Sequence, residues 1–127
     1  MAKTKTTSRK RKAPAKKSAT TSTQPFDVIA SQHFATWLAG QGIGLAVSTY
    51  QASKLFLLGL NAEGGLSVAE RTLDRCMGVT SAARSLYVAS RWQIWRFENA
   101  LRAGEVKDGF DAVFVPKSSH VTGDIDC

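Results

Sequence analysis

The sequence is poor in the residues and patterns that mark exported, membrane-spanning or zinc-binding proteins. Two cysteines in 127 residues, Cys76 and Cys127, form no spacing from which a disulfide framework or a zinc site can be argued. The longest apolar run, Leu55–Leu60, is far shorter than the roughly 20 residues that cross a bilayer. No apolar segment follows the N-terminal charges, as a secretory signal requires. We therefore expect a cytoplasmic protein with no membrane partner.

Enzyme motifs are missing as well. The chain has no glycine-rich phosphate loop, no nucleophile elbow and no paired-cysteine zinc motif. No cofactor is evident from these patterns, although the polar cluster of His120, Asp124 and Asp126 leaves a divalent metal as an open alternative. The sequence thus favours a non-catalytic role over an enzymatic one.

The positive charge is concentrated at the N-terminus. The whole chain carries a net charge of +7, but residues 25–127 hold nine basic against ten acidic side chains. The excess comes from residues 1–24, which contain no acidic residue and little that can be buried, so we expect a disordered basic tail. Its basic residues are Lys3, Lys5, Arg9, Lys10, Arg11, Lys12, Lys16 and Lys17.

Two functions fit this tail. The first is attachment to nucleic acid or another polyanion, which would be sequence-blind because no aromatic side chain is available for base stacking. Neutralising about seven phosphates would give log K a slope of about −6 against log salt, so such binding would be weak at physiological salt. The second is a solubilising or linking tail without a partner, and the sequence favours this second function.

A linker and a short capping helix are expected in residues 25–43. Ser31 can cap the helix and Gly40 can end it, because glycine tolerates the left-handed conformation found at many helix ends. The apolar residues between them recur at the spacing of one helical face and are Phe34, Trp37 and Leu38.

Residues 44–127 consist of short strand patterns separated by turn residues, with no helical periodicity between them. The pattern predicts an all-β domain with the helix as a preface. The expected strands are Gly44–Tyr50, Lys54–Leu60, Leu66–Leu73, Ser85–Ser90, Ile94–Asn99 and Asp111–Pro116.

Two of the expected hairpins align with each other. Leu45–Thr49 matches Leu86–Ser90 at an offset of 41 residues, and Leu55–Leu58 matches Ile94–Phe97 at an offset of 39. A period of about 40–45 residues with several short strands in each unit is typical of β-propeller blades. We therefore interpret residues 44–127 as part of a β-propeller with about two blades.

The blade interpretation makes further assignments. A third match aligns Val68 with Val113 at an offset of 45 residues. Side-chain alternation places Leu86 and Val88 on one face of their sheet and Tyr87 on the other. Since propellers close with four to eight blades, the chain is expected to be the N-terminal part of a truncated propeller.

Four segments resemble an uncharacterised family of conserved hypothetical bacterial proteins, catalogued as domain of unknown function 4915. The segments lie within residues 34–127 and are Val47–Leu60, Glu70–Met77, Gln93–Ala100 and Val121–Asp126. The resemblance implies a propeller-like protein longer than this chain, of which the chain would be a fragment. It implies no reaction, because none is established for the family.

The sharpest polar cluster is the segment from His120 to Asp126. His120, Asp124 and Asp126 offer one imidazole and two carboxylates, which bind divalent metals and can activate water. The alternative is that Thr122-Gly123-Asp124 forms a turn in which Asp124 bonds to local backbone, and the sequence favours this alternative.

A second candidate is the tight turn that contains Arg91 and Trp92. These side chains would contact a ligand or partner, with the cation stacked on the ring, or the indole would fold back over its own hairpin, and the sequence favours the second alternative. Asp74 and Arg75 are expected to form a strand-end ion pair or a turn, and Cys76 is expected to be a small packing residue.

The sequence therefore supports three functions. The first is a non-catalytic module that binds a small ligand or a protein partner through the propeller. The second is a metal-dependent propeller enzyme acting on a small polar substrate. The third is nonspecific nucleic-acid binding through the basic tail.

Overall fold

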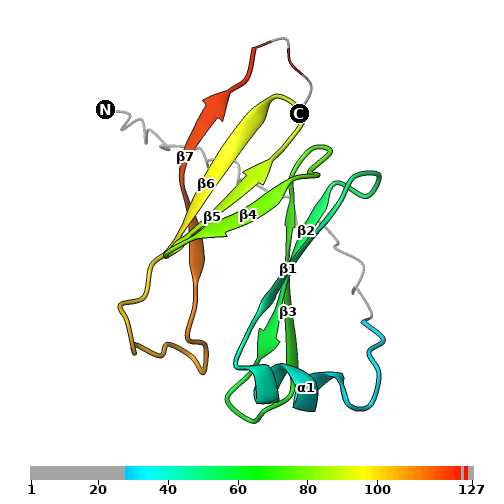
Figure 1. Cartoon of the computed structure of the whole chain (residues 1–127), viewed down its shortest axis with the longest axis vertical. Coiled ribbons are helices and arrows are strands. Elements are labelled where there is room, and N and C mark those ends of the chain that lie inside the picture. Colours follow the sequence, from blue (N-terminus) through cyan, green and yellow to red (C-terminus); the bar gives the residue numbers. More distant parts are fainter. Residues whose placement is uncertain (1–27, 124, 126–127) are drawn as a thin grey trace, which may run out of the picture.

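The computed structural model describes residues 28–123 and residue 125 (Figure 1). This part of the chain forms one short helix and two antiparallel sheets, and within each sheet the strands pair in chain order. The first sheet contains β1 (Leu45–Thr49), β2 (Lys54–Leu60) and β3 (Leu66–Thr72). The second contains β4 (Val79–Ala82), β5 (Ser85–Ala89), β6 (Gln93–Asn99) and β7 (Phe114–Val121). The prediction of a mostly β domain preceded by a short helix is confirmed.

The helix α1 spans Phe34–Gln41, and both predicted caps were wrong. His33 occupies the N-cap position without a side-chain bond, and Ser31 contributes only its backbone oxygen, which accepts from Phe34 N at 3.1 Å. Gly42 ends the helix instead of Gly40, because Gly42 adopts the left-handed conformation (φ 61°) and its N–H donates to the oxygens of the last turn.

The predicted correspondence between the two hairpins is present in the strand pairing. Leu45 lies opposite Leu58 in the first sheet, and Leu86 lies opposite Phe97 in the second. The offsets of 41 and 39 residues convert the first pair into the second. The same offsets convert the next pair on that face of the first hairpin, Val47 with Phe56, into Val88 with Trp95 in the second hairpin. The two hairpins therefore have the same register.

The third predicted match is in the wrong register. Val68 lies opposite Leu58, and Pro116 lies opposite Phe97, so the residue equivalent to Val68 is Pro116 rather than Val113. The expected strand Asp111–Pro116 is displaced for the same reason. Residues 100–113 form a connection before β7, and a β-bulge at Arg96/Phe97 adds one residue to β7.

The second sheet also contains a strand that the sequence did not reveal. β4 pairs with β5, whereas the equivalent edge of β1 carries no strand among the described residues. Counting back by the same offset of 41 residues places Leu38 of α1 at the position equivalent to Val79. Leu38 is fully buried and α1 contacts β2, so the helix packs on the first sheet.

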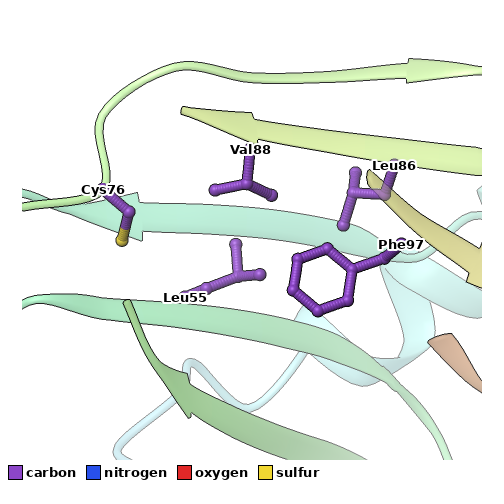
Figure 2. Close-up of a cluster of buried hydrophobic side chains, with 5 residues drawn as sticks. All are labelled: Leu55, Cys76, Leu86, Val88 and Phe97. Carbon is purple, nitrogen blue, oxygen red and sulfur yellow. The ribbon is translucent and has the colours of Figure 1, made fainter. Parts of the chain in front are cut away.

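The hydrophobic core lies between the two sheets (Figure 2). Leu55 of β2 meets Val88 and Phe97 of the second sheet, and Leu86 and Cys76 complete the cluster of buried side chains. The prediction that Leu86 and Val88 share a face is confirmed, because both are buried whereas Tyr87 is partly exposed. Cys76 is fully buried, as expected for a packing residue. We call the faces that meet here the inner faces, and the opposite faces the outer faces.

Candidate functional site

Three connections meet at one end of the molecule. The β1–β2 turn, the β3–β4 connection and the β5–β6 turn lie together, at the end opposite α1 (Figure 1). Arg91 N in the β5–β6 turn donates to Asp74 O at 2.9 Å, and Arg75 N donates to Ser53 Oγ at 3.1 Å. The three connections are therefore joined to one another by hydrogen bonds.

Two arginines stack on aromatic rings at this end. The Arg91 guanidinium lies 4.6 Å from the centre of the Trp92 ring, and that of Arg75 lies 5.8 Å from the centre of the Tyr50 ring. The stack of Arg91 on Trp92 belongs to the alternative in which this turn contacts a ligand or partner, and that role stays a prediction. We define the loop end as Tyr50, Arg75, Met77, Arg91 and Trp92.

The aromatic and thioether side chains of the loop end are exposed to solvent. Trp92 is 41% exposed, Tyr50 46% and Met77 56%. Their backbone is nevertheless fixed, because Met77 N donates to Ala89 O at 3.1 Å and Met77 O accepts from Ser48 Oγ at 2.5 Å. The loop end is thus an exposed patch of large side chains on an ordered, hydrogen-bonded support.

Sequence reasoning identified Arg91 and Trp92 but missed Tyr50 and Met77. A signal for Tyr50 was present, since the offset of 41 residues aligns it with Arg91 at the start of the equivalent turn. Met77 reaches the loop end through the irregular β3–β4 connection, where Arg75 takes a positive φ of 46°. No periodic pattern marks such a segment.

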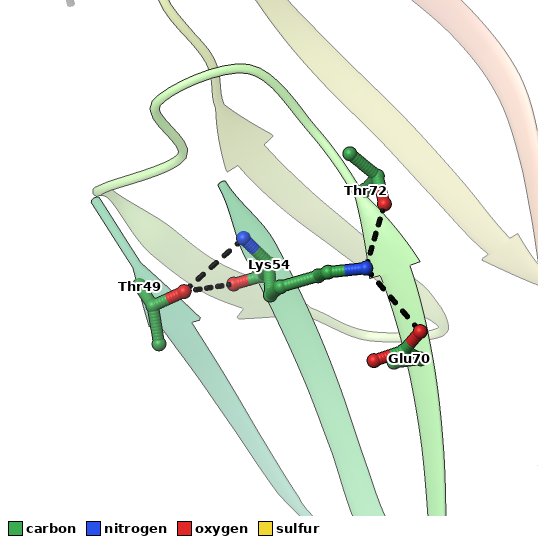
Figure 3. Close-up of polar contacts among 4 residues, drawn as sticks. All are labelled: Thr49, Lys54, Glu70 and Thr72. Carbon is green, nitrogen blue, oxygen red and sulfur yellow. Dashed lines mark hydrogen bonds and ion pairs between the residues drawn. The ribbon is translucent and has the colours of Figure 1, made fainter. Parts of the chain in front are cut away.

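A polar row borders the loop end on the outer face of the first sheet (Figure 3). Lys54 Nζ lies 3.3 Å from Glu70 Oε1 and 3.0 Å from Thr72 Oγ1, on the neighbouring strand. Thr49 Oγ1 bonds the backbone of Lys54 from the other side. Because these groups satisfy one another between paired strands, they fix the end of the sheet that carries the Tyr50 turn.

The predicted metal site is only partly covered by the described residues. His120 lies on β7, exposed and opposite Ile94. Asp124 and Asp126 lie outside the described residues, among which no group of three His, Cys, Asp or Glu side chains could hold a metal. Gly123 has a φ of 71° and Thr122 Oγ1 donates to Ile125 O, as in the alternative reading of a turn. The metal site stays a prediction.

The eight basic residues of the predicted tail also lie outside the described part of the chain. Polyanion binding by Lys3, Lys5, Arg9, Lys10, Arg11, Lys12, Lys16 and Lys17 therefore stays a prediction. Deleting residues 2–24 and measuring DNA retention at low salt would test it.

A charged cluster surrounds Glu98 on the second sheet. Lys117, the extra residue at the β-bulge, pairs with Glu98 Oε2, and Arg96 Nη2 lies 3.6 Å from the same oxygen. The hydrogen bond from Lys117 is the largest cause that lowers the pKa of the Glu98 carboxyl below its ordinary value, with the charges of Lys117, Arg96 and Arg84 adding to it. Partial burial acts in the opposite direction.

Replacing Lys117 by methionine is expected to raise the Glu98 pKa towards its ordinary value. In the native protein a lowered pKa contributes stability above the unfolded-state pKa, and this contribution is lost as the pH falls through the folded-state pKa. An NMR titration of the Glu98 carboxyl carbon measures the change. Lys107→Met, at an exposed lysine in the β6–β7 connection, is the matched control and should leave the Glu98 titration unchanged. Identical Glu98 titrations in the native chain and in Lys117→Met would contradict this assignment.

Two depressions contain none of the loop-end residues. One, of about 370 Å³, opens between β3 and β6 and is lined by Arg71, Leu73, Trp95 and Phe97 among others. The other, of about 320 Å³, lies along the connection of residues 100–113. Trp95 and Phe97 stack with ring centres 6.3 Å apart and pack against the core, so the first depression is bounded by structural side chains.

Comparison with known proteins places the chain in a family. A family profile described as "Domain of unknown function (DUF4915)" matches residues 32–127. The chain belongs to the DUF4915 family. The match extends over α1, both sheets and the loop end of this DUF4915 protein, and it confirms the resemblance seen in the sequence. No curated protein and no solved structure matches it.

Within residues 28–123 and 125, no helix combines the length and the apolar character needed to cross a bilayer.

Proposed function

We propose that this chain is a non-catalytic protein-binding module built from two successive blades of a β-propeller, with the loop end as its binding surface. The observation that carries the proposal is the pair of arginine–aromatic stacks, Arg91 on Trp92 and Arg75 on Tyr50, beside the exposed Met77. Aromatic residues, methionine and arginine are enriched in protein interfaces, and tryptophan, tyrosine and arginine dominate binding hot spots.

The blade assignment is supported by the shared register of the two hairpins. The second sheet is a four-stranded antiparallel meander, the usual composition of a blade. Leu45 opposite Leu58 and Leu86 opposite Phe97 are equivalent pairs in successive sheets. In repeat architectures each unit packs only on its neighbours and the connections of one end form the binding surface, which is where the loop end lies.

The chemistry of the loop end indicates the kind of partner. An open patch of rings and guanidinium groups suits an extended protein segment with aromatic and acidic side chains, which can stack on the rings and pair with the arginines. A small molecule is less suited, since small-ligand sites are concave and bury most of their ligand. The loop end is exposed rather than enclosed.

Selection from a displayed library of random peptides on the full chain tests the proposal. We expect peptides rich in aromatic and acidic residues, whose affinity by calorimetry falls at least about thirtyfold in Trp92→Ala, since hot-spot truncations cost about 2 kcal/mol or more. Trp92→Phe keeps a ring for stacking and should retain most of the affinity. Val106→Ala, at a side chain 64% exposed on the β6–β7 connection, is the matched control. Affinities that are unchanged in both Trp92→Ala and Tyr50→Ala would refute the loop end as the binding surface.

A metal-dependent propeller enzyme acting on a small polar substrate is the second candidate. It is favoured by one contact: Thr122 N donates to Trp92 O at 2.9 Å, which fixes the residue that follows β7 beside the loop end. Metal analysis of the purified full chain separates the two candidates. Stoichiometric metal that is lost in Asp124→Asn would support the enzyme and oppose a purely binding role.

A further inference from the structure

The two outer faces of the molecule are equivalent to the two inner faces that already pack together. On the inner faces, Leu55 of the first sheet is 1% exposed and Val88 of the second sheet is fully buried. The register of the hairpins makes Ile94 the equivalent of Leu55 and Val47 the equivalent of Val88. Alternation along the strands places Ile94 and Val47 on outer faces.

The exposure of these residues differs sharply from that of their equivalents. Ile94 is 38% exposed and Val47 44% exposed, although each occupies the position that is buried in the other sheet. Each of these two positions of the hairpin is therefore buried on the face that contacts the other sheet, and exposed on the face that contacts no sheet among the described residues. Each outer face has the apolar residue that the existing interface uses at its centre.

These faces are complementary to each other rather than to themselves. Within the chain, the face of the first sheet that carries Leu55 packs on the face of the second sheet that carries Val88. On the outer faces the assignment is reversed. The outer face of the second sheet carries Ile94, the equivalent of Leu55, and the outer face of the first sheet carries Val47, the equivalent of Val88. A second copy of this chain offers the missing partner for each.

We propose that the protein self-associates head to tail, with the Ile94 face of one copy packed on the Val47 face of the next. Such a contact is heterologous, because different surfaces of the two copies meet, and it continues the sheet stacking already present inside each chain. The contact uses none of the loop-end residues, so it stands or falls independently of the proposed binding function.

The surroundings of the two residues fit this arrangement. Around Ile94 the outer face of the second sheet presents Tyr87, Ala89 and Arg96, with the Arg96 guanidinium 5.9 Å from the centre of the Tyr87 ring. Beside Val47 on the outer face of the first sheet lies Leu45, which is half-buried. The Arg96 guanidinium is held by Glu98 and Ser85 on its own sheet, and Ile94 lies between Ala89 of β5 and the exposed His120 of β7.

Sedimentation velocity of the full chain over a range of concentrations provides the test. The native chain is expected to form larger species as its concentration rises. Val47→Asp and Ile94→Asp each place a charge at the centre of one face and should each be monomeric, with unchanged circular dichroism because both positions are at the surface. Val106→Asp, an exposed apolar position outside both faces, should associate like the native chain.

Mixing the two monomeric variants gives the decisive measurement. Val47→Asp keeps an intact Ile94 face and Ile94→Asp keeps an intact Val47 face, so the mixture should form a one-to-one heterodimer and nothing larger. A native chain that stays monomeric at every concentration would overturn the proposal. So would a dimer that survives either single substitution, which would indicate a symmetric contact, or a mixture that stays monomeric.

Discussion

Replacing Leu55 by alanine is expected to lower the free energy of unfolding by about 3 kcal/mol, within the range for leucines truncated in protein cores. Leu55 is 1% exposed and lies at the centre of the contact between the sheets, against Val88 and Phe97. Its truncation leaves a cavity that neither sheet can close alone, because hydrogen bonding within each sheet fixes the positions of the strands. Denaturant unfolding followed by circular dichroism measures the loss.

The chain contains its own control for this experiment. Ile94 has the equivalent position in the second hairpin but is 38% exposed, so Ile94→Ala should cost less than about 1 kcal/mol when the chain is dilute. Equal losses in Leu55→Ala and Ile94→Ala would show that the two sheets do not pack on each other through Leu55. The comparison therefore tests the packing and not only the hydrophobicity of the residue.

The second large effect is expected for Asn99→Ala, with a loss of about 2 kcal/mol. Asn99 Oδ1 accepts hydrogen bonds from Leu101 N at 3.1 Å and Val113 N at 3.0 Å, in a partly buried setting. One side-chain oxygen thus holds both ends of the connection between β6 and β7, and a buried amide left without a partner costs about 1–3 kcal/mol. Leu101, only 4% exposed, depends on the same anchor.

Asn61 serves as the matched control for Asn99. Its Oδ1 also accepts from two backbone amides, Glu63 N at 3.0 Å and Gly65 N at 2.8 Å, but at an exposed turn where water can replace it. Asn61→Ala should therefore cost less than about 1 kcal/mol. Hydrogen exchange at Leu101 and Val113 adds a local measurement, and exchange that stays slow at both amides in Asn99→Ala would count against the anchor.

The hairpins could be predicted from the sequence because their register is specified by side-chain alternation. Leu86 and Val88 alternate with Tyr87, and the same alternation in β1 and β2 gave the offsets that the strand pairing reproduces. A register shift of one residue would move the buried side chains of a strand to its outer face, so the alternation of apolar and polar residues specifies the register. Cys76 was likewise assigned correctly as a packing residue.

Other elements left no readable signal. β4 has only four residues, and the turn that follows it uses Ala83 with a φ of 51° where glycine or asparagine would have marked it. Pro116 suggested the end of a strand, but it lies on edge strand β7 next to the bulge, where a missing N–H is tolerated. The loop end depends on hydrogen bonds such as Arg91 N to Asp74 O, which join residues far apart in the sequence.

The sequential order of the strands bears on how the protein folds. Because the strands of each sheet pair in chain order, either sheet can assemble from local hairpins with little loop-closure entropy. Only the docking of one finished sheet onto the other brings together positions as distant as Leu55 and Phe97. Docking should therefore be the late, rate-limiting event, and the residues between the sheets should govern how fast the native state opens more than how fast it forms.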